Sequence, residues 1–415
     1  MKWILLLVAA LQTSVLYGVS ISSNPGAVNI EVGTGVLGEK LGFSKNSGLR
    51  VGGLWLGDEN YLYCGGVKPH HWSGNSLFIL DFSADMEKMI CWNGAKFGTS
   101  FLQFNGSPTN ADAGSVQGYN SLPGPSPLNR SELYELWYRQ ELFNNKFVIR
   151  IGKIVPSYDF NNVIKPLPME ESSLDIPATT GLIYTPVFVD PTLLGVLPGY
   201  YNSAYGITAT VTPVKSFYAS FGFYDGSLAR GKQTGLRRPQ FKSYYFGIAE
   251  IGFDWKIGKN EMPGNLGIGV WNQSGKLTAP PAPDERGIQG IYLFGAQRVW
   301  RKAPGVDNSG IIGFYQAGYN NSKTLPMNRY LGGGFTFLGL IPGRLDDNFG
   351  FGAAWSRLNR RLFSRKQELI VEGYYQAHLW KSIFFLTALS YIPNPGAGKD
   401  LKSVWASTAR IIALF

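Results

Sequence analysis

Hydrophobic and polar residues alternate with a period of two in several segments of the chain. Between Leu77 and Lys88, apolar side chains fall on one face of an extended strand and polar side chains on the other. The apolar face carries Phe78, Leu80, Phe82, Ala84 and Met86, and the polar face carries Asp81, Ser83, Asp85 and Glu87. Four polar residues do not fit an ordinary dry core, so the pattern predicts a strand with lipid on one side and water on the other.

The last segment, from Lys402 to Phe415, has the same alternation. One face would carry Trp405, Ala409, Ile411, Ala413 and Phe415, and the other Thr408, Arg410 and Ile412. A terminal aromatic residue on an amphipathic strand looks like the signal that outer-membrane barrels present to their assembly machinery. We therefore expect Phe415 to be a contact for the barrel assembly machinery, and the outer face to contact outer-membrane lipid.

Turn-forming clusters between such segments predict about sixteen strands, an even number as single-chain bacterial barrels require. The strands are expected to begin near Leu49, Leu77, Lys96, Leu133, Lys146, Tyr201, Phe217, Tyr244, Gly264, Ile288, Gly310, Asn328, Asn348, Lys366, Ile383 and Lys402. Short links at 144–145, 380–381 and around Pro213 would face the periplasm. Longer links near 106–131, 154–200 and 226–243 would face outward.

The predicted fold is therefore all-β, a transmembrane antiparallel β-barrel with short periplasmic turns and long extracellular loops. A β-sandwich also alternates, with its apolar face inward, and periodicity does not separate the two directly. The N-terminus favours the barrel, because Lys2, the apolar run 3–16 and the small residues Gly18 and Ser20 resemble a secretory signal peptide. We expect a signal peptide at 1–20, a periplasmic segment at 21–47 and a barrel domain at 48–415, located in the bacterial outer membrane.

The most apolar later stretch, 181–197, is interrupted by Pro186, Asp190 and Pro191, so it is expected to be a loop rather than a membrane helix. It could fold into a pore or lie on the surface. Composition agrees with many short strands, because 14% of residues are aromatic, 52 are glycine and only 16% are charged.

Charge and cysteine content change the prediction little. The net charge of +10 comes without a basic run or recognition motif, so no nucleic-acid partner is expected. Cys64 and Cys91 would lie at opposite ends of adjacent strands, roughly 25 Å apart, whereas a disulfide needs Cα atoms within about 7 Å. We expect both thiols to be free.

Several segments resemble the carbohydrate-selective porin (OprB) family. The clearest are SGLRVGGLWLGDENYLYCGG at 47–66, ADMEKMICWNG at 84–94 and ELYELWYRQELFNNKFVIRIGK at 132–153, with fainter ones at 223–226, 290–300, 339–347, 372–379 and 391–398. The resemblance implies a barrel of about sixteen strands with inward-folded loops, a short helix over Val36–Leu41, and passage of small saccharides. One departure is Ala296, where the family leads us to expect an acidic residue.

The expected function is passive or facilitated diffusion of small saccharides through a polar lumen. The alternatives are a general or anion-biased porin, or an outer-membrane carbohydrate-binding protein that transports nothing. A homotrimer is also conceivable for this strand number. His70, His71 and His378 are the only histidines, and no G-x-S-x-G motif occurs, so no enzyme, cofactor or metal site is expected.

A sugar is uncharged, rich in hydroxyl groups and has apolar C–H faces, so charged and aromatic side chains in the lumen would suit it. Alternation places Glu135, Trp137, Arg139 and Glu141 on one face. The candidate pore-lining residues are Glu135, Trp137, Arg139, Arg150, Lys153, Glu87, Asp85 and Arg410. Further candidates are Glu250, Asp254, Glu368 and Glu372, with Trp55 and Tyr158 as stacking faces or parts of an interfacial girdle. Each charged residue could instead brace the barrel wall.

Overall fold

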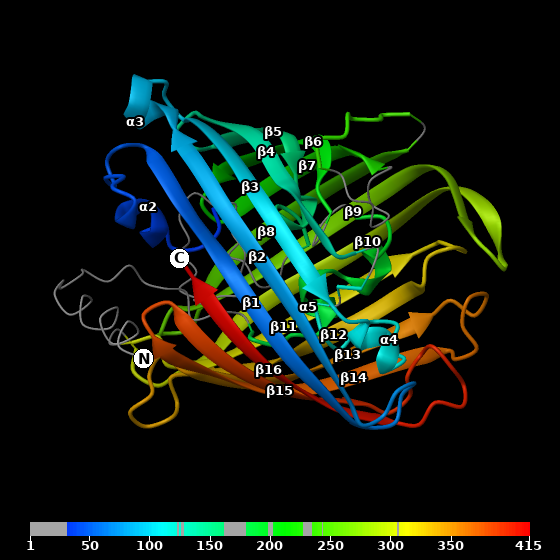
Figure 1. Cartoon of the computed structure of the whole chain (residues 1–415). Coiled ribbons are helices and arrows are strands. Elements are labelled where there is room, and N and C mark those ends of the chain that lie inside the picture. The colour runs from blue at the N-terminus through cyan, green and yellow to red at the C-terminus, as the bar shows by residue number, and fades with distance from the viewer. Residues whose placement is uncertain are drawn as a thin grey trace.

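The computed structural model describes residues 31–122, 124–125, 128–161, 180–197, 202–226, 235–242, 244–304 and 307–415. Sixteen antiparallel strands form a closed barrel in which each strand pairs with its sequence neighbours and β1 pairs with β16 (Figure 1). The strands are β1 (Leu49–Cys64), β2 (His71–Asp85), β3 (Ala95–Gly106), β4 (Arg130–Leu142), β5 (Phe147–Ile154), β6 (Ala204–Val214), β7 (Phe217–Asp225), β8 (Tyr245–Ile257), β9 (Met262–Ala279), β10 (Ala282–Arg301), β11 (Gly310–Asn320), β12 (Met327–Leu338), β13 (Asn348–Leu358), β14 (Gln367–Trp380), β15 (Ile383–Ile392) and β16 (Val404–Leu414). The predicted fold is confirmed.

Side chains alternate between the two faces of the wall as the polarity pattern predicts. On β2, Asp81 and Ser83 face the interior and are almost fully buried, whereas Leu80 and Phe82 face outward and are exposed. On β16, Trp405 and Ile411 are exposed on the outside and Arg410 is buried inside. The barrel is therefore largely apolar toward the membrane and carries charged residues such as Asp81 and Arg410 within.

Most strands begin within three residues of the predicted positions, but β2 and β10 begin well before them. β2 starts at His71 rather than near Leu77, and β10 starts at Ala282 rather than near Ile288. These early portions lie at the end of the barrel that carries the longer loops, beyond the apolar band. A strand surrounded by water on both faces has no reason to alternate in polarity, so the pattern misses it.

Short turns gather at one end of the barrel. Residues 143–146, 215–216 and 381–382 join β4 to β5, β6 to β7 and β14 to β15, as predicted for the periplasmic side. Helices α2 (Val36–Lys40) and α3 (Met86–Ile90) lie at the same end, at the upper left of Figure 1. Helix α2 occupies the segment where the family resemblance implies a helix.

The predicted strand through Lys88 is too long, because β2 ends at Asp85. The Asp85 carboxylate accepts hydrogen bonds from the backbone N–H groups of Glu87 and Lys88 and so caps α3. Glu87 consequently lies in an exposed helix, where its carboxylate accepts a hydrogen bond from the backbone N–H of Gly94 at 2.9 Å. The placement of Glu87 on the inner wall of a strand was wrong.

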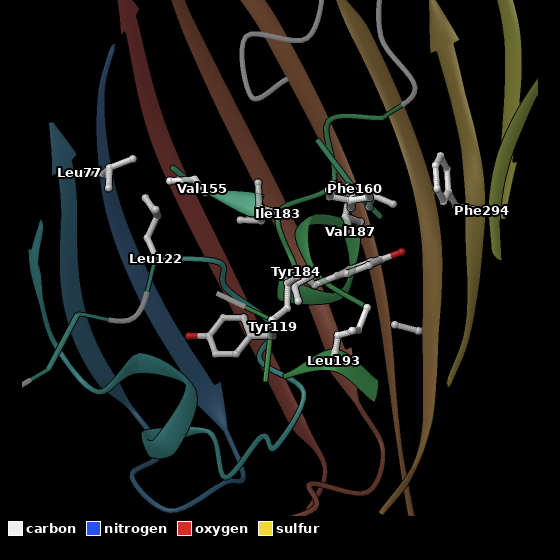
Figure 2. Packing of buried hydrophobic residues seen from close by; sticks show 14 of the residues in the cluster. Leu77, Tyr119, Leu122, Val155, Phe160, Ile183, Tyr184, Val187, Leu193 and Phe294 are labelled. Atoms are coloured by element: carbon white, nitrogen blue, oxygen red, sulfur yellow. The ribbon is translucent and has the colours of Figure 1, made fainter. Parts of the chain in front are cut away.

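Two long loops fold into the barrel from the opposite end. The loop after β3 contains α4 (Thr109–Asp112), and the loop after β5 contains η1 (Pro156–Tyr158), α5 (Thr185–Phe188) and η2 (Pro191–Leu193). Their apolar side chains pack together inside the wall, as Figure 2 shows for Tyr119, Leu122, Ile183, Tyr184 and Val187. Of the two alternatives for 181–197, the inward-folded loop is correct.

Three further points concern the ends and the cysteines. The expected signal peptide at 1–20 lies outside the described residues. Cys64 and Cys91 are both free and exposed, as expected. In the described part of the chain, no helix combines the length and the apolar character needed to cross a membrane.

Candidate pore lining

Inward-facing carboxylates on the barrel wall hold the loop after β5 in place. Glu135 on β4 accepts a hydrogen bond from the backbone N–H of Val155 at 3.2 Å, and Glu250 on β8 accepts one from Asn161 at 2.8 Å. Glu372 on β14 accepts a third from Ile183 at 2.6 Å. Since a backbone N–H inside the barrel needs an acceptor, each carboxylate fixes one point of the loop.

Glu250 also accepts hydrogen bonds from side chains of the wall. Besides the loop N–H, it accepts hydrogen bonds from the hydroxyls of Tyr218 at 2.6 Å and Tyr292 at 2.7 Å. Glu250 is only 3% exposed. For Glu250, Glu135 and Glu372, the structure therefore shows the bracing role that was considered alongside direct contact with a solute.

The loop after β3 is held by a second set of polar contacts. The Arg410 guanidinium donates two hydrogen bonds of 2.7 Å to the Asp58 carboxylate across the β1–β16 pair. Asn120 of the loop donates to Asp58 at 2.8 Å. On the other side, Glu368 accepts backbone N–H groups of Val116 at 3.0 Å and Gln117 at 2.8 Å. Arg410 and Glu368 thus anchor the loop to adjoining parts of the wall.

A row of charged side chains crosses the inner wall nearer the periplasmic end. Directly paired residues on consecutive strands are Asp85 with Lys96, Lys96 with Arg139, and Arg139 with Arg150. We call Lys96, Arg139 and Arg150 the basic row. Lys96 and Asp85 also line a cavity of about 320 Å³ between α2 and strands β1 to β3.

Each arginine of the basic row has an acidic partner. Arg139 pairs with Glu141 at 2.9 Å, and their side chains remain 24% and 15% exposed. The Arg150 guanidinium, which is only 3% exposed, donates to Asp159 at the end of η1 and lies 3.8 Å from Glu135. Arg139 and Glu141 are therefore open to solvent inside the barrel, whereas Arg150 is enclosed.

The other predicted residues are either enclosed or lie outside the lumen. The Lys153 ammonium donates to the backbone carbonyls of Leu133 and Gly235, and the residue is 1% exposed. Trp137 is 3% exposed and lies flat against Gly98, where an added Cβ would meet its ring at 2.1 Å. Trp55 faces outward and is 38% exposed, so it belongs to the membrane face and not to the lumen. Tyr158 is half-buried in η1.

Several inner-wall residues were not singled out from the sequence. They include Lys96 of the basic row, Asp58 under Asn120, and Arg50, which pairs with Asp81 at 2.9 Å. Asp159, the loop residue that pairs with Arg150, was not singled out either. Alternation places Asp58 and Arg50 on the inner face, but only the register between strands shows which charges meet. Asp254 faces inward, and Ala296 lies inside with its backbone N–H bonded to the Asn265 side chain at 2.8 Å.

A closed barrel with an apolar outer face, charged residues within and long loops folded into its interior is the architecture of an outer-membrane porin. The chain belongs to the carbohydrate-selective porin, OprB family, whose model matches residues 77–407. It is accordingly a bacterial outer-membrane protein that lets small saccharides diffuse through its barrel.

Solved structures show the same fold at low sequence identity. The high-pH structure of Pseudomonas putida OprB aligns with a TM-score of 0.77 and 16% identity, covering 92% of this chain and 96% of that one. The outer-membrane channel DcaP of Acinetobacter baumannii aligns with a TM-score of 0.52 and 10% identity, covering 90% and 99%. No curated protein sequence matches the chain.

Proposed function

We propose that saccharides cross the barrel along the inner wall of β1 to β5, where they contact the solvent-exposed Arg139–Glu141 pair. The observation that carries this proposal is the basic row, with Arg139 and Glu141 partly exposed inside the barrel. The guanidinium can donate to sugar hydroxyl oxygens, and the carboxylate can accept from sugar hydroxyl groups. The two side chains neutralise each other's charge. They would therefore replace part of the sugar's hydration without binding the sugar tightly.

The inward loops support this route by filling other parts of the interior. Their apolar cluster, which includes Tyr119, Ile183 and Tyr184, packs inside the barrel (Figure 2). The carboxylates that anchor the loop after β5 lie on β4, β8 and β14. A solute is thereby directed away from this dry cluster and toward exposed polar side chains. The loops act in the proposal as a constriction, and the basic row as the surface that a sugar meets.

Replacement of Arg139 by alanine tests the route. We expect Arg139→Ala to increase single-channel ion conductance, because a long side chain leaves the narrowed lumen, and to weaken the block of that current by added sugars. The loss of one charge-assisted hydrogen bond should weaken the block by about tenfold. Both quantities are measured in planar bilayers with a panel of mono- and oligosaccharides.

Arg286→Ala is the matched control, because Arg286 is exposed on the β9–β10 hairpin, away from the barrel interior. It removes the same side chain and should leave conductance and sugar block unchanged. If Arg139→Ala behaved like the control while both variants kept the folded, heat-modifiable electrophoretic mobility, the proposed route would be wrong.

A second candidate function, an anion-biased channel, has its own supporting observation. The three side chains of the basic row are all cationic, and only the two arginines have acidic partners among the contacts of the described residues. Lys96 lies directly opposite Asp85 in the strand register but forms no ion pair among the described residues, so its ammonium can attract anions at the periplasmic mouth. A preference for anions would exist alongside the passage of uncharged sugars and would not replace that function.

We also propose the remaining partners from the class of protein. Phe415 directly follows β16, with its ring stacked on Phe78 at 5.8 Å between centroids, which suits recognition of this strand by the barrel assembly machinery. Assembly into a homotrimer and direct contact with outer-membrane lipid are further proposals. Passage is proposed to involve no enzymatic step, since the family and the fold are those of channels.

A further inference from the structure

The outer face of the barrel carries an unusual polar row across β11 to β14. Directly paired residues on these four strands are Tyr319 with Arg329, Arg329 with Arg357, and Arg357 with Gln367. Arg329 and Arg357 are both exposed and point away from the lumen. They lie near the extracellular end, where β12 begins and β13 ends.

This row marks the extracellular edge of the apolar band. The next outward row toward the periplasm consists of Ala317, Leu331, Trp355 and Leu369, and the following one of Tyr315, Gly333, Ala353 and Val371. Leu331 is 60% exposed on this face, as expected for a residue in contact with lipid. The two arginines therefore sit at the level of lipid headgroups, just beyond the acyl chains.

Two arginines directly opposite each other repel, and this pair has no compensating acid. Among the described residues, neither guanidinium makes an ion pair or a hydrogen bond, and the one cation–π contact of the pair places Arg329 over the Tyr319 ring at 5.9 Å. Like charges at directly opposed positions of a β-sheet destabilise it. An anion seated between the two guanidinium groups would turn this repulsion into attraction.

The neighbouring loops strengthen the positive charge. The loops at 321–326 and 359–366 add exposed Lys323, Arg360, Arg361 and Lys366, and no Asp or Glu occurs in 310–345 or 348–367. The two loops are joined by Asn359, whose side chain donates to the carbonyl of Lys323 at 2.8 Å. Glu285 of the β9–β10 hairpin does reach the first loop, but its carboxylate is occupied by backbone N–H groups, including that of Thr324 at 2.9 Å.

We propose that Arg329 and Arg357 bind the phosphate group of a membrane lipid in the outer leaflet. A phosphate has the charge and the oxygen geometry that guanidinium groups bind in bidentate fashion. A lipid headgroup is favoured over a free anion because the pair lies directly above the lipid-facing residues Leu331 and Trp355, so the acyl chains of the same molecule would cover the apolar rows. The surrounding lysines and arginines would attract further headgroups.

The experiment measures lipid-dependent thermal unfolding of the full chain in a mild nonionic detergent, with dioleoyl phosphatidic acid as the phosphate-bearing probe. Phosphatidic acid should raise the unfolding temperature of the wild type. In the Arg329→Gln/Arg357→Gln double variant the apparent affinity should fall by about tenfold or more, because two charge-assisted contacts are lost. Without lipid, the variant should unfold at the same temperature as the wild type or higher, because the repulsion is removed.

The Lys302→Gln/Lys381→Gln variant removes the same net charge from exposed positions at the periplasmic end, and it should respond to phosphatidic acid like the wild type. Dioleoylglycerol, which lacks the phosphate, should stabilise neither protein. The proposal is overturned if the double arginine variant, still folded by electrophoretic mobility, keeps the response to phosphatidic acid. It is also overturned if inorganic phosphate gives the same stabilisation as the lipid, which would show a site for a free anion.

Discussion

At the scale of single residues, glycines on the inner face of the wall lie next to aromatic side chains of the neighbouring strand. An added Cβ at Gly252 would lie 1.8 Å from the Tyr218 ring, and one at Gly269 would lie 2.1 Å from the Tyr292 ring. Each glycine leaves space for a ring that lies flat against the wall. Tyr218 and Tyr292 can then direct their hydroxyls to Glu250, which in turn anchors the inner loop.

Asp190 is a second informative residue because its carboxylate is buried inside the barrel and makes no ion pair with any residue that the structure describes. One oxygen accepts the backbone N–H of Thr192 at 2.8 Å, and the other has no hydrogen-bond partner within the described part of the chain. Burial raises the pKa of Asp190 from 3.8 to about 6, although the bonds from Thr192 oppose the rise. Ionisation of this side chain therefore costs free energy in the folded loop.

We predict that Asp190→Asn stabilises the protein at pH 8 and not at pH 4. A pKa raised in the folded state means that the folded protein binds the proton more tightly, so the cost is absent below pH 3.8 and complete above about pH 6. The full cost corresponds to roughly 3 kcal/mol. Thermal unfolding across this pH range checks it, and an equal shift of the variant at both ends would contradict the assignment to Asp190.

At the scale of elements, the segment before α2 closes over the seam between the first and last strands. The backbone N–H groups of Thr34 and Gly35 donate to the Phe415 carbonyl at 3.1 and 3.3 Å, and Arg50 donates to the carbonyl of Gly33 at 2.7 Å. Gly33 has a φ of 79°, and an added Cβ would lie 2.2 Å from the Gly53 carbonyl oxygen. No other residue type fits that close contact.

Gly33→Ala should therefore release this segment from the barrel. We expect trypsin to cleave the folded protein after Lys40 and Lys45 about tenfold faster in the variant, since local opening controls such cleavage. Gly42→Ala is the matched control, because Gly42 has a φ of 93° but an added Cβ there meets nothing within 4 Å. Equal cleavage of the two variants would show that backbone strain alone, and not the lost contact, is responsible.

The elements that could be predicted from the sequence are those whose surroundings change from lipid to water across the wall. The alternation in 77–84 and 402–415 is imposed by the bilayer, so it identifies strands and the direction of their side chains. It fails at Glu87, where the Asp85 cap starts a helix, and it cannot show that Lys96, Arg139 and Arg150 are neighbours. That arrangement depends on the register between strands, which local polarity does not determine.

The inner loops were predictable only in outline. Pro186, Asp190 and Pro191 exclude a membrane helix, but the path of the loop depends on Glu135, Glu250 and Glu372, which lie on widely separated strands. The same carboxylates were attractive as candidates for sugar contact because they are charged and face inward. The structure shows that each of them is buried and already accepts a hydrogen bond from a backbone N–H group of the loop.

At the scale of the whole molecule, the charge distribution predicts a preference for anions. The basic row lies inside the barrel, and Lys96, although directly opposite Asp85 in the strand register, makes no ion pair among the described residues. In a potassium chloride gradient, the reversal potential should show chloride to be more permeant than potassium. The preference should decline at high salt, because the Debye length falls from about 10 Å at 0.1 M to about 3 Å at 1 M.

Lys96→Glu should move the reversal potential toward potassium, whereas Lys302→Glu, at an exposed periplasmic turn, should change it little. A cation-preferring wild-type channel would refute the assignment of the basic row to the conducting path.

The inner loop bonded to β4, β8 and β14 also has a mechanical consequence. The loop links distant strands of the wall through these hydrogen bonds. It therefore opposes flattening of the barrel cross-section under lateral pressure from the bilayer. The aperture of this channel should accordingly stay constant when membrane tension or bilayer thickness varies.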